Sequence, residues 1–169
     1  MISPEHVRLM ARYNRWQNRS LYTAAATLDE AGRRADRGAF FGSIDATLGH
    51  LLWGDRIWMS RLAGTEPPKE TSIAQSTKEG GDWDGLCLAR AALDAAILTW
   101  ADTLTEAEIA ADLHWFSGAL QRDMITPRWI CITHMFNHQT HHRGQVHAML
   151  TAAGARPEDT DIPFMPEDV

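Results

Sequence analysis

The longest segment without a helix breaker lies near the C-terminal end of the sequence. Thr126 and Pro127 form a typical helix start, and the helical pattern continues to Gly154 with only Gly144 inside it. This segment is expected to be the longest helix of the fold.

Three further segments carry helical periodicity over more than four turns. They span residues 4–28, 43–64 and 83–104, with Pro4 at the first turn of one and Ser43 as the cap of the next. Together with the C-terminal segment they predict an all-α four-helix bundle.

Weaker patterns connect and follow these segments. Residues 112–125 are compatible with a small β-hairpin before the last long helix, and Thr105 with Glu108 predicts a capping box. Residues 155–169 contain three prolines and five acidic residues and are expected to be an irregular tail on the surface. The prediction is one domain over residues 1–154, followed by this tail.

Composition excludes several classes of function. The net charge of -6 argues against a nucleic-acid partner, because such binding depends on lysine and arginine near phosphates. Cys87 and Cys131 are too few for a disulfide framework or a thiolate zinc site. No signal-like N-terminus and no membrane-spanning stretch is found. We therefore expect a cytoplasmic protein without a membrane partner.

The last helical segment is rich in histidine. At about 100° per residue, His138 and His142 differ by roughly 40° and share the apolar, inward-facing stripe. Residues four apart on a helix have Cβ atoms about 5 to 6 Å apart, so two rings can bind one ion. Five of the eight histidines lie in this segment: His134, His138, His141, His142 and His147.

The alternative is that both rings are core residues hydrogen-bonded to their neighbours. Each neutral ring buries one donor and one acceptor that need partners, and a metal ion would satisfy both rings together. A third ligand is expected from another helix, and His50 is the only histidine of the second one. His50 taken alone would more often be structural. His6 and His114 are less suitable.

Two blocks of sequence resemble the DinB/YfiT-like family. Residues 136–145 (FNHQTHHRGQ) resemble its fourth-helix signature, and residues 48–58 (LGHLLWGDRIW) resemble its second-helix block. The resemblance covers all but about the last dozen residues and implies a four-helix bundle of the DinB/YfiT type. It also implies a divalent metal, usually nickel or zinc, on His50, His138 and His142. A homodimer is implied as well.

The function implied by the resemblance is that of a metal-dependent enzyme. Relatives with known activity resemble transferases or isomerases that use a low-molecular-weight thiol. The expectation is therefore activation of a small thiol or water for transfer to a small electrophilic substrate. The alternative is a noncatalytic protein whose ion is structural or sensed. Iron would also suit the geometry, and no catalytic side chain is assigned.

Several neighbours of the predicted triad receive structural roles. Asn137, Gln145 and Asp55 are candidate acceptors for the second ring nitrogens. The helical spacing of the tryptophans favours core positions, and the alternative for Trp53 and Trp58 is that they wall the pocket beside His50. Gly144 is expected to permit close helix packing. The Glu-x-x-His pairs of carboxylate di-iron proteins and the HExxH motif are both absent.

Overall fold

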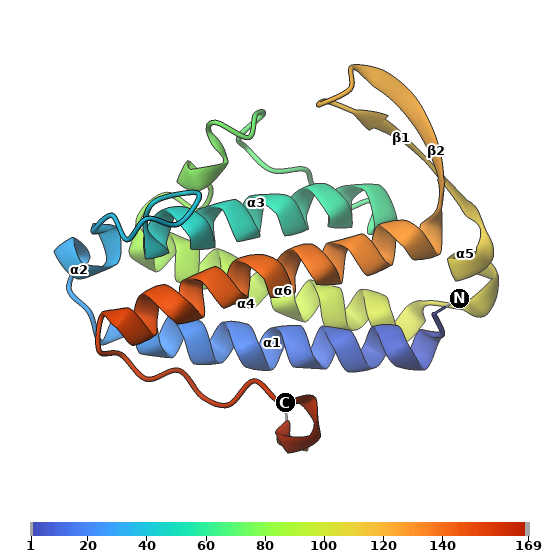
Figure 1. Cartoon of the computed structure of the whole chain (residues 1–169). Coiled ribbons are helices and arrows are strands. Elements are labelled where there is room, and N and C mark those ends of the chain that lie inside the picture. The colour runs from blue at the N-terminus through green and yellow to red at the C-terminus, as the bar shows by residue number, and fades with distance from the viewer. Residues whose placement is uncertain (1, 168–169) are drawn as a thin grey trace.

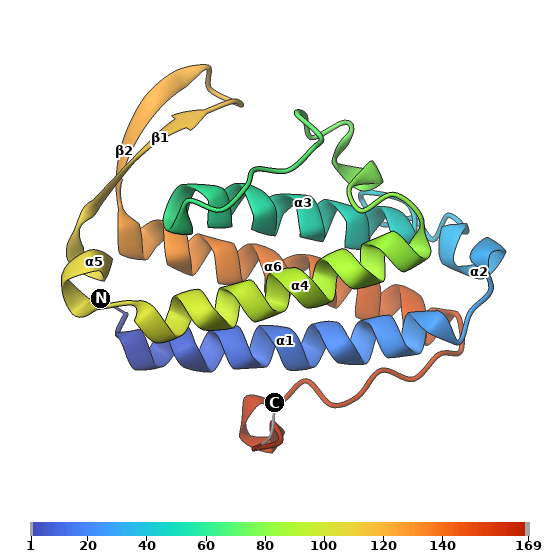
Figure 2. The same ribbon diagram turned by 180° about the vertical axis from the view of Figure 1, so that it is seen from behind.

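The computed structural model describes residues 2–167, which are mostly helical with one small antiparallel sheet. Four long helices lie side by side (Figure 1, and from behind in Figure 2). They are α1 (Pro4–Ala26), α3 (Ile44–Ala63), α4 (Trp83–Thr103) and α6 (Arg128–Ala152). The short elements are α2 (Glu30–Arg34), α5 (Glu106–Ala110), η1 (Ser76–Lys78) and η2 (Ile162–Phe164). The predicted predominance of helix is confirmed.

Side-chain caps explain where the helices begin. The hydroxyl of Ser43 accepts from the Ala46 N–H at the start of α3, and Asp82 caps α4 in the same way. Gly64, with φ of 67°, ends α3 in a conformation that glycine adopts at low cost. The predicted capping box of Thr105 and Glu108 is present at the start of α5.

The predicted β-hairpin is also confirmed. Strands β1 (Asp112–Ser117) and β2 (Arg122–Pro127) pair antiparallel, with Trp115 opposite Met124. The hairpin projects beyond the long helices and curves over the side of α3 (Figure 1). Trp115 packs on Trp58 of α3, with ring centroids 5.4 Å apart. The middle of β1 therefore packs against α3.

The core combines apolar packing with a buried layer of charged side chains. Leu52, Ile97 and Ile132 come from three different helices and have no exposed surface. Among them, Arg90 of α4 contacts Asp55 of α3 at 2.6 Å and Asp94 at 2.9 Å. Each of these three charges thus has an opposite charge beside it, which offsets the cost of burying it.

The segment after α6 runs along α1. The hydroxyl of Tyr13 donates to the Thr160 carbonyl at 2.8 Å, and the Trp16 indole donates to the Glu158 carboxylate at the same distance. Among the described residues, no helix is long and apolar enough to cross a membrane.

Candidate metal centre

Three histidines from two helices meet between α3 and α6. His50 lies on α3, and His138 and His142 lie one turn apart on α6. One ring nitrogen of each histidine lies within 4.8 Å of one ring nitrogen of each of the other two. His50 and His142 are only 5% and 7% exposed. The structure therefore brings together the three residues selected from the sequence.

Within residues 2–167, no other group of three or more His, Cys, Asp or Glu side chains converges in this way. His134 and His141 have exposed rings that flank the triad, 5.9 Å from His138 and 4.8 Å from His142 between centroids. His6 and His114 are exposed. They take no part in the triad.

A serine that the sequence analysis missed fixes the ring of His50. The Nδ1 atom of His50 lies 2.8 Å from the hydroxyl of Ser76, which donates its own proton to the Ile73 carbonyl at 2.7 Å. The serine oxygen must therefore accept from an Nδ1–H. This leaves the lone pair of His50 on Nε2, which lies 3.2 Å from Nε2 of His138.

Gln145 has the same role at His142. Its amide oxygen lies 2.8 Å from Nδ1 of the ring, which favours a proton on Nδ1 and a lone pair on Nε2. Of the three acceptors proposed from the sequence, Gln145 is therefore confirmed as a partner. Asn137 is exposed, and the Asp55 carboxylate accepts from Arg90 instead.

The ring of His138 packs against the backbone of α3. A Cβ atom at Gly54 would lie only 2.8 Å from Cε1 of His138, so this approach requires glycine. Gly144 meets nothing within 4 Å, and its expected role in close helix packing is wrong. The buried Nδ1 of His138 has no hydrogen-bond partner in the described part of the chain.

Burial keeps the three rings neutral. It lowers the pKa of His50 to about 4 and that of His138 to about 3, and it also lowers the pKa of His142. Neutral imidazoles with converging lone pairs are good ligands for zinc, nickel or iron. The residues present therefore fit a divalent ion. They would supply three protein ligands, one fewer than in a closed four-ligand site.

Two aromatic rings lie beside His50. Phe41 stacks on His50 with centroids 4.0 Å apart, and Trp53 lies 5.6 Å from the same ring. For Trp53 the alternative position beside His50 is thus confirmed. For Trp58 it is not, because its nearest histidine is His134 at 5.0 Å. Phe41 lies in the loop before Ser43, the cap of α3. Hydrophobic periodicity gives no information on the path of such a loop, so the contact of Phe41 with His50 was not predicted.

The loop between α3 and α4 is held against the site. The side chain of Glu79 is fully buried, pairs with Arg56 and accepts from the Glu70 N–H at 3.2 Å. A Cβ atom at Gly49 would lie 2.5 Å from the Thr77 carbonyl, so α3 and this loop are in direct contact. These contacts place Ser76 beside His50.

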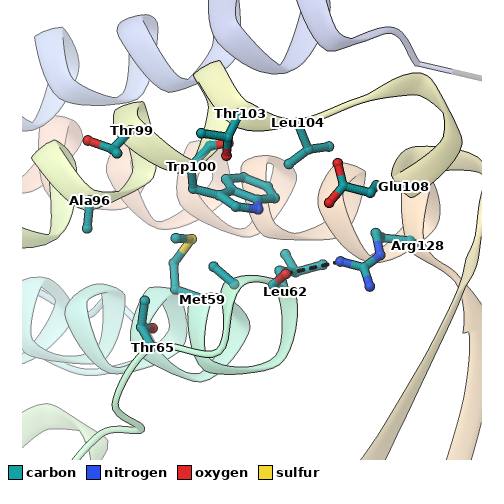
Figure 3. Close-up of a pocket in the computed structure, with 11 residues that line it drawn as sticks. Met59, Leu62, Thr65, Ala96, Thr99, Trp100, Thr103, Leu104, Glu108 and Arg128 are labelled. Atoms are coloured by element: carbon teal, nitrogen blue, oxygen red, sulfur yellow. Dashed lines mark hydrogen bonds between the residues drawn. The ribbon is translucent and has the colours of Figure 1, made fainter.

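A surface pocket of about 540 Å³ lies elsewhere, between α3 and the end of α4 (Figure 3). Met59 and Trp100 contribute apolar walls, and Arg128 at its edge donates to the Leu62 carbonyl at 3.0 Å. None of the three histidines lines it. The candidate metal centre is therefore separate from this pocket.

The fold and the site define a helical protein with a three-histidine candidate metal centre. A family model described as DinB family matches residues 1–168. The chain therefore belongs to the DinB family, as the two sequence blocks indicated. No significant match is found among curated proteins.

Proposed function

We propose that the protein is a metal-dependent enzyme that activates a low-molecular-weight thiol or water for transfer to a small electrophilic substrate. The observation that carries this proposal is the convergence of three neutral imidazoles at His50, His138 and His142. Three protein ligands, instead of four, are typical of catalytic metal sites.

A divalent ion at this site, with nickel or zinc expected and iron also compatible, would lower the pKa of a thiol or water at its open position. The protein's own contribution is to hold the rings. Ser76 and Gln145 keep protons on the Nδ1 atoms of His50 and His142, and Phe41 covers the His50 ring. These contacts leave the Nε2 lone pairs of His50 and His142 free to bind the ion.

The arrangement of the helices, the assembly and the location of the protein are also matters of proposal. We propose that the four long helices form a four-helix bundle of the DinB/YfiT type. We also propose that the protein is a cytoplasmic homodimer with neither nucleic-acid nor membrane partners. Sedimentation analysis of the purified chain tests the dimer directly.

A noncatalytic role is the second candidate. His50 lies on α3 and the other two ligands lie on α6, so an ion would also tie these helices together. For a structural or sensed ion, this link between the two helices would be sufficient. Such an ion would not need an open position for a thiol.

Cobalt substitution separates the two roles. The metal-free protein would be loaded with cobalt and titrated with 2-mercaptoethanol, and the thiolate-to-cobalt absorption would be recorded. We expect saturable absorption in wild type and in His141→Ala, and its loss in His142→Ala. Stoichiometric cobalt without any response to thiol would contradict thiol activation and favour the structural role.

A further inference from the structure

The surface pocket between α3 and the end of α4 has the dimensions of a small-molecule site (Figure 3). Its volume of about 540 Å³ falls within the range of about 300 to 1,000 Å³ that is common for such sites. Met59 and Leu62 of α3 lie on one side of it, and Trp100 of α4 lies on the other. These side chains give the pocket an apolar interior.

Polar groups without hydrogen-bond partners surround this interior. Within residues 2–167, Oγ1 of Thr65 and Nε of Arg128 are buried and have no partner. The indole N–H of Trp100 and Oε1 of Glu108 have none in the same range, although water can reach Glu108. Buried polar atoms without partners are rare in proteins, because leaving them unpaired costs free energy. A polar ligand in the pocket would offset that cost.

Glu108 and Arg128 place opposite charges at one end of the pocket without pairing with each other (Figure 3). Neither forms an ion pair with a residue between 2 and 167. Oε2 of Glu108 accepts from the backbone N–H of Thr105 at 2.9 Å and from its hydroxyl at 2.7 Å. Nη1 of Arg128 donates to the Leu62 carbonyl at 3.0 Å. The two charges are therefore held apart by other contacts, and both line the pocket.

Both side chains keep binding groups free. The hydrogen bonds from Thr105 lower the pKa of the Glu108 carboxyl group and the charge of Arg128 lowers it further, so Glu108 is charged at neutral pH. Nε and Nη2 of Arg128 have no partner among residues 2–167, and together they form a planar edge that suits a carboxylate. The pocket thus offers an anion for an ammonium group and a cation for a carboxylate.

A ligand that meets both charges carries both signs, and it also has an apolar part for Met59, Leu62 and Trp100. An α-amino acid has an ammonium and a carboxylate on one carbon atom. We infer that this pocket binds a free α-amino acid with a large apolar side chain, with its ammonium group on Glu108 and its carboxylate on Arg128. The competing explanation is that Glu108 only caps α5 and that Arg128 only links α6 to the end of α3.

This site is independent of the candidate metal centre. None of His50, His138 and His142 lines the pocket. The inference therefore goes beyond the proposed function, and either one can fail while the other stands.

The test uses L-phenylalanine and two analogues that keep the ring, phenethylamine without the carboxylate and phenylpropionate without the ammonium group. Their binding to the purified protein would be measured by ligand-observed NMR on wild type, Glu108→Gln and Arg128→Gln. Glu106→Gln and Arg122→Gln are the matched controls. Each removes the same charge from an exposed residue that does not line the pocket.

We expect wild type and both controls to bind phenylalanine about ten-fold or more tightly than either analogue, as for charge-assisted hydrogen bonds. Glu108→Gln should lose the advantage of phenylalanine over phenylpropionate, and Arg128→Gln should lose its advantage over phenethylamine. Equal affinity of wild type for phenylalanine and either analogue would overturn the inference. An advantage over phenylpropionate that survives Glu108→Gln would overturn it as well. So would the absence of binding of phenylalanine, leucine and tryptophan to wild type.

Glu108→Gln also keeps the test independent of folding defects. Glutamine preserves the capping box with Thr105, so this variant is expected to fold as wild type does. Arg128→Gln loses the hydrogen bond to Leu62, and circular dichroism would check both variants. If Arg128→Gln does not fold, the result for Glu108→Gln decides alone. The metal content of Glu108→Gln should equal that of wild type, because the pocket is separate from the histidines.

Discussion

The hydroxyl of Ser76 lies 2.8 Å from Nδ1 of His50 and donates a hydrogen bond to the Ile73 carbonyl. This chain of two hydrogen bonds runs in one direction only, because a carbonyl cannot donate. It therefore fixes which nitrogen of His50 is free. A residue on the loop between α3 and α4 thus determines which ring nitrogen of His50 keeps its lone pair.

Replacing Ser76 with alanine should weaken metal binding while the protein stays folded. The Nδ1–H of His50 would lose its acceptor, and such losses beside metal ligands reduce affinity by about 10- to 100-fold. Competition with a chromogenic zinc chelator measures the effect. Ser72→Ala, four residues earlier in the same loop, should bind zinc as wild type does. Equal affinity of the two variants would contradict the role of Ser76.

Gly54→Ala should disturb the site, whereas Gly144→Ala should not. A methyl group at Gly54 would push against the ring of His138, 2.8 Å away, and at Gly144 it would meet nothing. We expect lower zinc affinity for the first variant. For the second we expect unchanged affinity and a gain in stability of up to about 1 kcal/mol. Calorimetry and urea unfolding of both variants provide the comparison.

The stability of the metal-free protein should depend on pH, because His50 and His138 are buried as neutral rings. Above pH 6.5 the rings are neutral in both folded and unfolded states, whereas below it the unfolded rings bind protons. The folded rings stay neutral, because burial lowers the pKa of His50 to about 4 and that of His138 to about 3. The free energy of unfolding contributed by these rings should therefore fall as the pH falls from 6.5 toward 4.

The double variant His50→Leu/His138→Leu isolates this contribution, because other titrating groups are common to both proteins. Its free energy of unfolding should depend less steeply on pH than that of wild type over the same interval. Urea unfolding in the presence of a chelator measures both slopes. Parallel slopes would show that the two rings are not buried as neutral groups.

The helices and the triad could be predicted because both depend on local patterns. Pro4, Ser43 and Gly64 mark helix ends by their own conformational preferences, and the 40° offset of His138 and His142 follows from helix geometry alone. The contact between His50 and the other two required only that both stripes face inward.

The remaining parts of the site depend on loops and on which surfaces meet. Ser76 and Phe41 lie in segments without periodicity, so nothing in the sequence indicated that they approach His50. Gly54 and Gly144 are both glycines within helices, and only the packed structure shows which one faces another helix. Tertiary contact, not propensity, decides such positions.

The loop between α3 and α4 should loosen when Glu79 becomes glutamine. The buried carboxylate neutralises Arg56 and accepts backbone N–H groups, and breaking a buried ion pair costs about 3 to 5 kcal/mol. Limited proteolysis should cut residues 65–81 faster in this variant. Glu66→Gln, an exposed change in the same loop, should be cut as wild type is. Equal cleavage of both variants would show that Glu79 does not anchor the loop.

The metal content of the untagged protein tests the central claim most directly. Elemental mass spectrometry would be applied to wild type, His138→Ala and His134→Ala after purification and after dialysis against nickel or zinc. We expect one divalent ion per chain in wild type and His134→Ala, and its loss in His138→Ala. Equal metal content in all three proteins would contradict a centre built on His50, His138 and His142.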